Sequence, residues 1–158
     1  IYCCYGGSHS SVTAAAIHLD MLPLNRKPTS AELLAIPFYD QQTNKDHGYF
    51  RFMGNDAYGN EVYIIGKHNL RKHFENMIRE IAAAFEFDQE ELAIIDTMPY
   101  VNAAMVIGGF TSRRLGIVSI GRPIVVWGTK NAYLKLAAVV NRLKMTVARG
   151  RNPHGGTK

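Results

Sequence analysis

The first twenty residues place thiol, imidazole and hydroxyl groups around a pair of glycines, in the order IYCCYGGSHSSVTAAAIHLD. The apolar run Ile1–Tyr5 is typical of a buried strand, and the alanines from residue 14 onward are typical of a helix. The first backbone N–H groups of a helix have no partner within it, and the helix dipole favours an anion there. We therefore predict a strand–turn–helix site for a phosphate or another anionic small molecule. Its predicted binding residues are Gly6, Gly7, Ser8, Ser10 and Ser11.

A nucleotide-binding or phosphoryl-transfer protein is the first hypothesis for this turn. A full phosphate-binding P-loop has the pattern G-x-x-x-x-G-K-[ST], in which the lysine contacts phosphate and the hydroxyl binds Mg²⁺. Here Cys3 and Ser8 take the glycine positions and His9 takes the lysine position, so the match is partial. Asp96 follows an apolar run, as does the aspartate that holds Mg²⁺ in such enzymes. This hypothesis makes His9 and Asp96 candidate catalytic residues, and it adds Mg²⁺ as a cofactor if a nucleotide is bound.

Thiol chemistry is the alternative, with Cys4 as the candidate nucleophile. Cysteine-dependent phosphatases place a thiolate at the end of a strand, then five loop residues, and then an arginine at the start of a helix. In this chain the arginine position is occupied by Ser10, so another segment would have to supply the positive charge. The alternative function is therefore a cysteine-dependent phosphatase or thiol enzyme. A non-catalytic ligand-sensing module, which binds its anion without turnover, is a third hypothesis.

The segment GGFTSRRLG, residues 108–116, is the second candidate source of chemistry. Guanidinium groups bind phosphate and carboxylate groups bidentately, so Arg113 is predicted to reach the anion from a second side. The histidines of the chain show no shared spacing of the kind that metal ligands have. We therefore predict an anion site and no metal site.

The charge distribution argues against a nucleic-acid-binding surface. The chain of 158 residues has a formal net charge of +5, and much of the positive excess lies after residue 141. These clustered basic residues predict a flexible, solvated tail over residues 149–158. The rest of the chain, residues 1–148, is predicted to form a single α/β domain. The composition does not determine the oligomeric state, so an oligomer is one of the alternatives.

Cysteine usage and hydropathy predict where the protein works. Cys3 and Cys4 are adjacent, so they face opposite sides of a strand and are predicted to be free thiols, as in a reducing cytoplasm. No apolar run has the length needed to span a bilayer, which predicts a cytoplasmic protein without membrane contact.

Strands that alternate with helices predict an α/β fold, a three-layer sandwich with a mainly parallel sheet, helices on both faces and a β-hairpin at one edge. The segments Ile1–Tyr5, Leu92–Ile95 and Ile124–Trp127 are near-continuous apolar runs, which is typical of neighbouring parallel strands in the centre of a sheet. Tyr49–Met53 and Glu61–Ile65 flank a glycine-rich turn and predict the hairpin, whose first strand lies at the edge.

The remaining segments predict helices and the position of the site. Thr29 and Glu32 fit a capping box at the start of a short helix, and a helix near residues 100–107 is expected to stop at Gly108 and Gly109. A long amphipathic helix is expected from residue 130. Three polar clusters follow the predicted strands: the turn at residues 6–11, residues 96–97 and residues 128–130. Ligands gather at the carboxyl ends of parallel strands, so these clusters are predicted to converge.

Several segments together resemble a known bacterial family. They are YCCYGGSHSSVTAAAIHLDMLP, GNEVYIIG, GGFTSRRLGIVSIGRP and GTKNAYLKLAAVV, of which CYGGSHSS is the most specific part. The family is known from Gram-positive spore formers as domain of unknown function 3189, and the resemblance runs over most of the chain. It implies a small cytoplasmic protein whose activity has not been assigned. It therefore implies no catalytic residue, and the candidate residues rest on their own chemistry.

Overall fold

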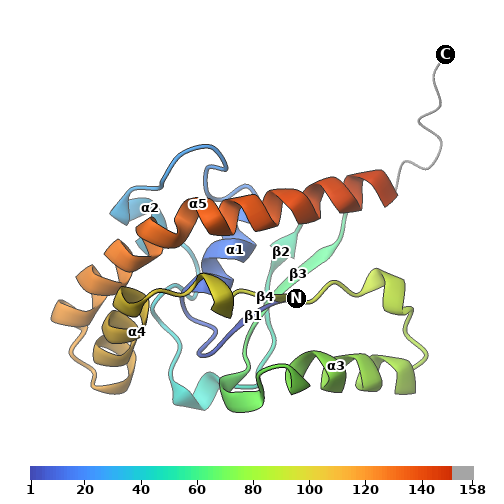
Figure 1. The fold of residues 1–158 in the computed structure, drawn as a ribbon, viewed down its shortest axis with the longest axis horizontal. Coiled ribbons are helices and arrows are strands. Elements are labelled where there is room, and N and C mark those ends of the chain that lie inside the picture. Colours follow the sequence, from blue (N-terminus) through green and yellow to red (C-terminus); the bar gives the residue numbers. More distant parts are fainter. Residues whose placement is uncertain (151–158) are drawn as a thin grey trace.

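A mixed sheet lies at the centre of the computed structural model, which describes residues 1–150 (Figure 1). In these residues the sheet has four strands in the order β2-β3-β1-β4. β1 pairs in parallel with both β3 and β4, whereas β2 pairs antiparallel with β3. The α/β class is therefore confirmed, and the sheet contains one antiparallel pair. The strands are β1 (Tyr2–Cys4), β2 (Arg51–Asn55), β3 (Glu61–Gly66) and β4 (Ile95–Asp96).

The predicted hairpin is confirmed, with β2 as the edge strand. Its second strand, β3, runs beside β1 and aligns Ile64 with Tyr2. The predicted strand Leu92–Ile95 lies slightly further along the chain, because residues 89–91 form a 3₁₀ turn and the pairing with β1 involves only Ile95 and Asp96. The predicted parallel pairing of the first strand with this segment is nevertheless confirmed.

The prediction of a strand at Ile124–Trp127 is wrong, because this segment lies inside helix α5 (Val118–Gly150). A short apolar run fits a buried strand and a buried helix equally well, so periodicity could not separate them. In the helix Val125 is buried, whereas Trp127 is 62% exposed. The strands that flank β1 are β3 and β4.

The predicted helix end at Gly108 and Gly109 agrees with the end of α4 (Ala103–Gly109), but the chain continues directly as a π-helix over Phe110–Arg114. Gly108 also serves helix packing. A Cβ atom at Gly108 would lie 2.4 Å from the backbone nitrogen of Val125, and one at Gly121 would lie 2.3 Å from that of Ser112. At these two glycines the backbones of α4 and the π-helix approach the backbone of α5 too closely for any side chain.

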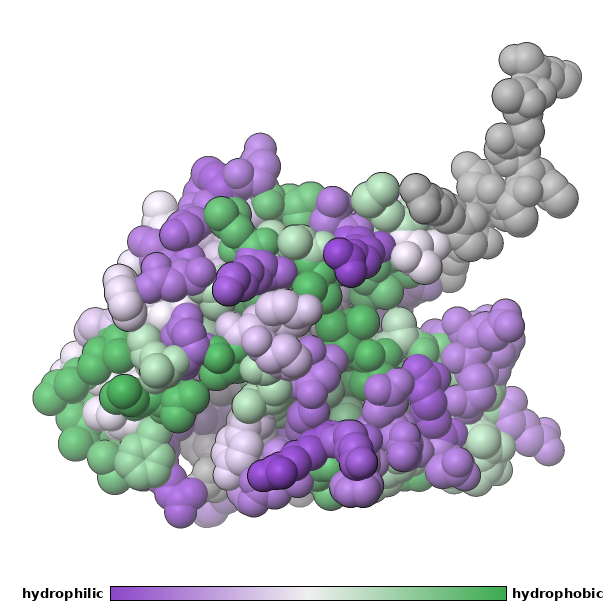
Figure 2. Space-filling model, viewed as in Figure 1, coloured by the Kyte–Doolittle hydropathy of each residue, from purple (hydrophilic) through white to green (hydrophobic). Residues whose placement is uncertain are grey.

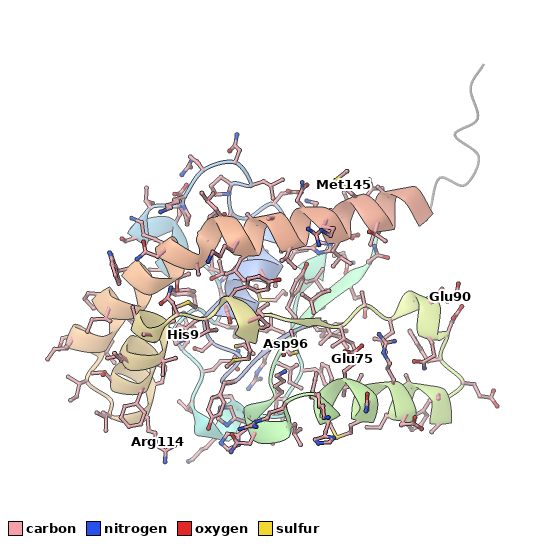
Figure 3. The ribbon with its side chains drawn as sticks, in the orientation of Figure 1. His9, Glu75, Glu90, Asp96, Arg114 and Met145 are labelled. Carbon is pink, nitrogen blue, oxygen red and sulfur yellow. The ribbon has the colours of Figure 1, made fainter. Side chains whose placement is uncertain are left out.

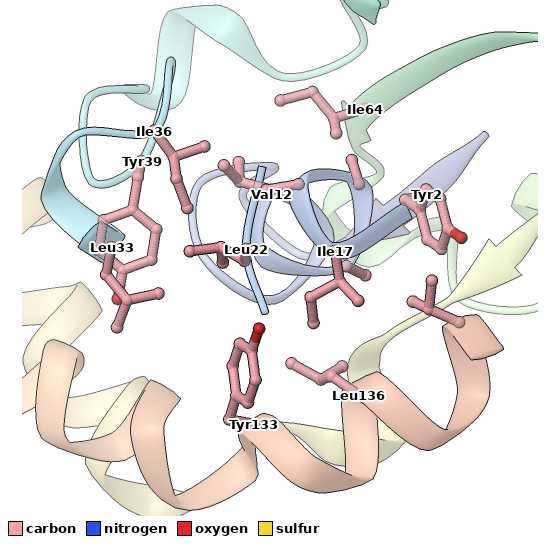
Figure 4. Packing of buried hydrophobic residues seen from close by; sticks show 14 of the residues in the cluster. Tyr2, Val12, Ile17, Leu22, Leu33, Ile36, Tyr39, Ile64, Tyr133 and Leu136 are labelled. Atoms are coloured by element: carbon pink, nitrogen blue, oxygen red, sulfur yellow. The ribbon is translucent and has the colours of Figure 1, made fainter. Parts of the chain in front are cut away.

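Helices cover both faces of the sheet (Figure 1). The side chain of Tyr2 packs into the main hydrophobic core, together with residues of α1 (Ser10–His18) and α5. In this core Tyr133 and Leu136 of α5 lie close to Ile17 of α1 (Figure 4). Cys3 points the other way and packs with Phe74 of α3 (His73–Ala84). The two cysteine side chains consequently lie on opposite faces of β1, and both are free thiols, as predicted.

Short helical segments connect these elements. Helix α2 (Ser30–Leu34) begins with the predicted capping box, in which Thr29 and Glu32 exchange hydrogen bonds. The 3₁₀ turns span Asn44–Asp46, His68–Leu70, Gln89–Glu91 and Met98–Tyr100. No helix within residues 1–150 combines the length and the apolar character needed to cross a membrane. Of the predicted tail, residues 149–158, only the first two residues are described, and they end α5. The division into a domain over residues 1–148 and a tail stays a prediction.

Candidate functional site

The predicted turn lies at the carboxyl end of β1, between the ends of β3 and β4. The chain moves from β1 to β3 on one side and later to β4 on the other, so this is the point where the strand order reverses. Open α/β sheets bind ligands in the crevice at such a point. A cavity of about 360 Å³ lies here. The predicted site residues that line it are Cys4, Gly6, Ser8, His9, Ser10 and Arg113.

The shape of the turn depends on Gly7, whose φ is +67°. A Cβ atom at this position would lie 2.6 Å from the backbone nitrogen of Gly66, so a larger residue would collide with β3. Ser10 is held by a hydrogen bond from the hydroxyl of Thr97, 2.8 Å away. The same hydroxyl is 2.9 Å from the carbonyl oxygen of Cys3, which ties the start of α1 to the end of β1. The turn is therefore fixed by glycine geometry and buried hydroxyl contacts.

The thiol of Cys4 contacts one polar group of the turn and one of helix α1. The backbone N–H of Gly7 donates to Sγ over 3.1 Å, and the hydroxyl of Ser11 lies 3.1 Å from the same sulfur. Cys4 is buried yet lines the cavity. Gly7 and Ser11 do not line it, but they position the thiol that does. These two contacts fix the position of the sulfur at the edge of the cavity.

His9 is oriented by Asp40, a residue that the sequence interpretation missed. Nε2 of His9 lies 3.1 Å from Oδ1 of Asp40, whose side chain is fully buried. A carboxylate only accepts hydrogen bonds, so Nε2 carries the proton in this contact. Nδ1 has no hydrogen-bond partner among residues 1–150 and lies beside Gly109, which also lines the cavity. His9 is thereby left with a free ring nitrogen for proton transfer or for binding a ligand.

Asp40 contacts side chains from three parts of the chain. Besides His9, Nε of Arg113 lies 3.0 Å from Oδ1, and Nε of Arg122 lies 2.8 Å from Oδ2. The hydroxyl of Ser112 donates to the same carboxylate over 2.9 Å. Burial by itself would raise the pKa of Asp40, but the hydrogen bonds from His9, Arg122 and Ser112 lower it to about 2. A single carboxylate thus anchors the histidine of the turn and an arginine of the cavity in one cluster.

Two arginines face the turn across the cavity. Arg113, which was predicted, and its neighbour Arg114 both line the cavity from the π-helix. Figure 3 shows Arg114 at the end of α4 and His9 beside the same helix. The cations around the cavity outnumber the buried carboxylate of Asp40, which favours an anion there.

Asp96 is placed differently from the other predicted residues. Its Oδ2 lies 2.5 Å from Nζ of Lys67, and its Oδ1 accepts a hydrogen bond from the backbone N–H of Met98. It does not line the cavity, and in Figure 3 it lies away from Arg114, towards α3. The polar cluster expected at residues 128–130 does not converge on the site, because it lies within α5, where the hydroxyl of Thr129 accepts a hydrogen bond from Tyr39.

Gln42 is a further residue that sequence reasoning missed. It is buried, lines the cavity and donates from Nε2 to the carbonyl oxygen of Gly7 over 2.6 Å. Its Oε1 has no hydrogen-bond partner among residues 1–150, which is unusual for a buried oxygen. The only local signal in this stretch is a proline followed by aromatic and polar residues, PFYDQQ, and it does not point to the turn.

Within residues 1–150 no group of three or more His, Cys, Asp or Glu side chains is arranged to hold a metal ion. A Mg²⁺ ion that accompanies a nucleotide stays a prediction.

A family model described as "Protein of unknown function (DUF3189)" matches residues 1–145. The match covers every residue of the site and confirms the resemblance stated from the sequence. No curated protein and no solved structure matches the chain.

Proposed function

Since the chain belongs to the DUF3189 family, whose description states no activity, we propose from the site that it binds a phosphate-bearing or other anionic small molecule at the carboxyl end of β1. The observation that carries this proposal is a cavity in which the glycine–serine turn faces Arg113 and Arg114. The N-terminus of α1 supplies partial positive charge from one side, and the guanidinium groups supply full charges from the other. Two free cysteines support a cytoplasmic location for this activity.

Each part of the turn has a role in this proposal. Ser8 and Ser10 line the cavity with hydroxyl groups that can donate to anion oxygens, and Gly6 leaves room for close approach of the backbone. His9 adds a positive charge when its Nδ1 is protonated, while Asp40 holds the ring in place. Gln42 adds an acceptor oxygen for a hydroxyl or protonated group of the ligand.

We expect inorganic phosphate to stabilise the folded protein, because a ligand that binds only the folded state adds RT ln(1 + [L]/Kd). This term is about 2.7 kcal/mol at one hundred times Kd. Arg113→Met is expected to remove most of that gain, and so is the double change His9→Ala with Ser10→Ala. The measurement is the shift in melting temperature on adding phosphate, taken for each variant against its own phosphate-free state.

Arg79→Met is the matched control, because Arg79 also pairs with a carboxylate but lies on the exposed side of α3. Its phosphate-dependent shift should equal that of the unmodified protein. If Arg113→Met and the double variant show the same phosphate-dependent shift as the unmodified protein, phosphate binds elsewhere and the proposal is overturned.

A cysteine-dependent phosphatase is a second candidate, favoured by the position of Cys4 at the cavity and by the N–H of Gly7, which donates to its sulfur. In this reaction the thiolate attacks phosphorus, so that the S–P bond forms while the P–O bond to the leaving alcohol breaks. His9, protonated on Nδ1, can give a proton to the leaving oxygen. Water then attacks phosphorus and gives a proton to His9, the S–P bond breaks, and the products are inorganic phosphate, the restored thiolate and the reprotonated His9. Arg113 supplies the positive charge that cysteine-dependent phosphatases have from an arginine at the position of Ser10. The first hypothesis, P-loop-like phosphoryl transfer, would instead require Mg²⁺ for ligand binding.

A further inference from the structure

The wall of the cavity that faces the turn is apolar. Met98, Val101, Met105, Val106 and Phe110 line it from the segment that leads into α4, from α4 itself and from the π-helix. Val106 is 58% exposed and Phe110 is 50% exposed, so folding alone does not cover this wall. Figure 2 shows hydrophobic residues gathered at the end of the molecule where α4 and the start of α5 lie. Such a surface gains free energy when an apolar group covers it.

The polar groups that line the cavity come from the turn, from residues 42–47 and from Arg113 and Arg114 at the end of the π-helix, and the stretch between Met98 and Phe110 contributes none. Sugar hydroxyls or base edges placed against Met105 and Val106 would lose their hydrogen bonds to water without replacement, which is unfavourable. A hydrocarbon ring in the same place has no hydrogen bonds to water to lose, and it would bury apolar surface area. The volume of about 360 Å³ lies near the lower end of the range of small-molecule sites, which runs from about 300 to 1,000 Å³.

Building on the proposed anion site, we infer that the ligand is a phosphate monoester of an apolar, ring-sized alcohol, such as an aryl phosphate, in preference to a nucleotide or a sugar phosphate. The phosphate lies at the turn, against Arg113, and the ring lies against Val106 and Phe110. The same geometry places the ester oxygen between the turn and the apolar wall.

Isothermal titration of the full chain with three probes tests this inference: phenyl phosphate, inorganic phosphate and ribose 5-phosphate. We expect phenyl phosphate to bind at least about tenfold more tightly than the other two, since burial of a phenyl ring in an apolar site contributes favourable free energy. Val106→Asn is expected to reduce this advantage by about fivefold, because it places an amide against the ring.

Ile107→Asn is the matched control. Ile107 follows Val106 on α4 and is 57% exposed, but it does not line the cavity, so the same change should leave the preference for phenyl phosphate intact. Equal affinity for all three probes, or equal effects of the two asparagine variants, would overturn the inference while leaving the anion site standing. If no probe binds, and Arg113→Met leaves the phosphate-dependent shift in melting temperature unchanged, the proposed function itself is wrong.

Discussion

Asp40→Asn is expected to lower the free energy of unfolding by about 3 kcal/mol, because removing one member of a buried charge cluster leaves its partners uncompensated. Asp40 is fully buried and pairs with His9, Arg113 and Arg122. Asparagine keeps the size of the side chain, and it tolerates the φ of +51° at this position, so the change removes the charge and little else. Urea unfolding at neutral pH measures the difference.

Asp20→Asn is the control for this prediction, because Asp20 also pairs with a cation, Lys144, but its side chain is 71% exposed. Exposed ion pairs contribute little, so a loss below about 1 kcal/mol is expected there. Equal losses in the two variants would contradict the central role that we assign to Asp40.

The stabilisation from Asp40 also depends on pH. Its pKa is about 2 in the folded protein, below its value of about 3.9 in an unfolded chain. A depressed carboxyl pKa contributes stability that is present above the unfolded pKa and is lost as pH falls towards the folded pKa. The difference in unfolding free energy between the unmodified protein and Asp40→Asn should therefore be largest above pH 4 and shrink between about pH 4 and pH 2.

Cys4→Ser is expected to lower the hydrolysis of an aryl phosphate by about 1,000-fold or more, as removal of a nucleophile does in other covalent enzymes. Phosphate binding should change little, because serine keeps the shape of the side chain and the N–H of Gly7 and the hydroxyl of Ser11 keep their places. Release of phenol from phenyl phosphate measures turnover, and calorimetry measures binding. The thiol of Cys4 should react with iodoacetamide in the folded protein, and phosphate should slow this reaction.

Cys3→Ala is the control, because Cys3 faces α3 and packs with Phe74 away from the cavity. Burial raises the pKa of Cys3 to about 12, so this thiol stays protonated near neutral pH. Turnover in Cys3→Ala should match that of the unmodified protein. Alkylation of Cys4 that occurs only on unfolding, together with phosphate binding but no turnover, would contradict the phosphatase candidate and leave a ligand-sensing module.

Local interactions determined the parts of this protein that the sequence predicted correctly. The strand at Tyr2–Cys4, the glycine turn, the helix after it, the hairpin and the capping box of α2 all depend on residues close together in the chain. Glycine conformation, hydroxyl capping and period-two alternation act over a few residues, so they are visible in the sequence. The candidate anion turn, with Cys4 and His9 in it, was found for the same reason.

Tertiary structure alone decided the partners of these residues. Asp40 lies 31 positions from His9 and 82 from Arg122, and no local pattern links them. The segment 124–127 lies in a helix whose backbone packs closely against α4 and the π-helix at Gly108 and Gly121, and Arg113 lines the cavity from that π-helix. Apolar runs of a few residues suit a strand and a helix equally, and only the neighbours present in the folded chain select between them. The charge cluster at Asp40 depends on that choice, since Arg122 and Ser112 reach the carboxylate only when both helices are in place.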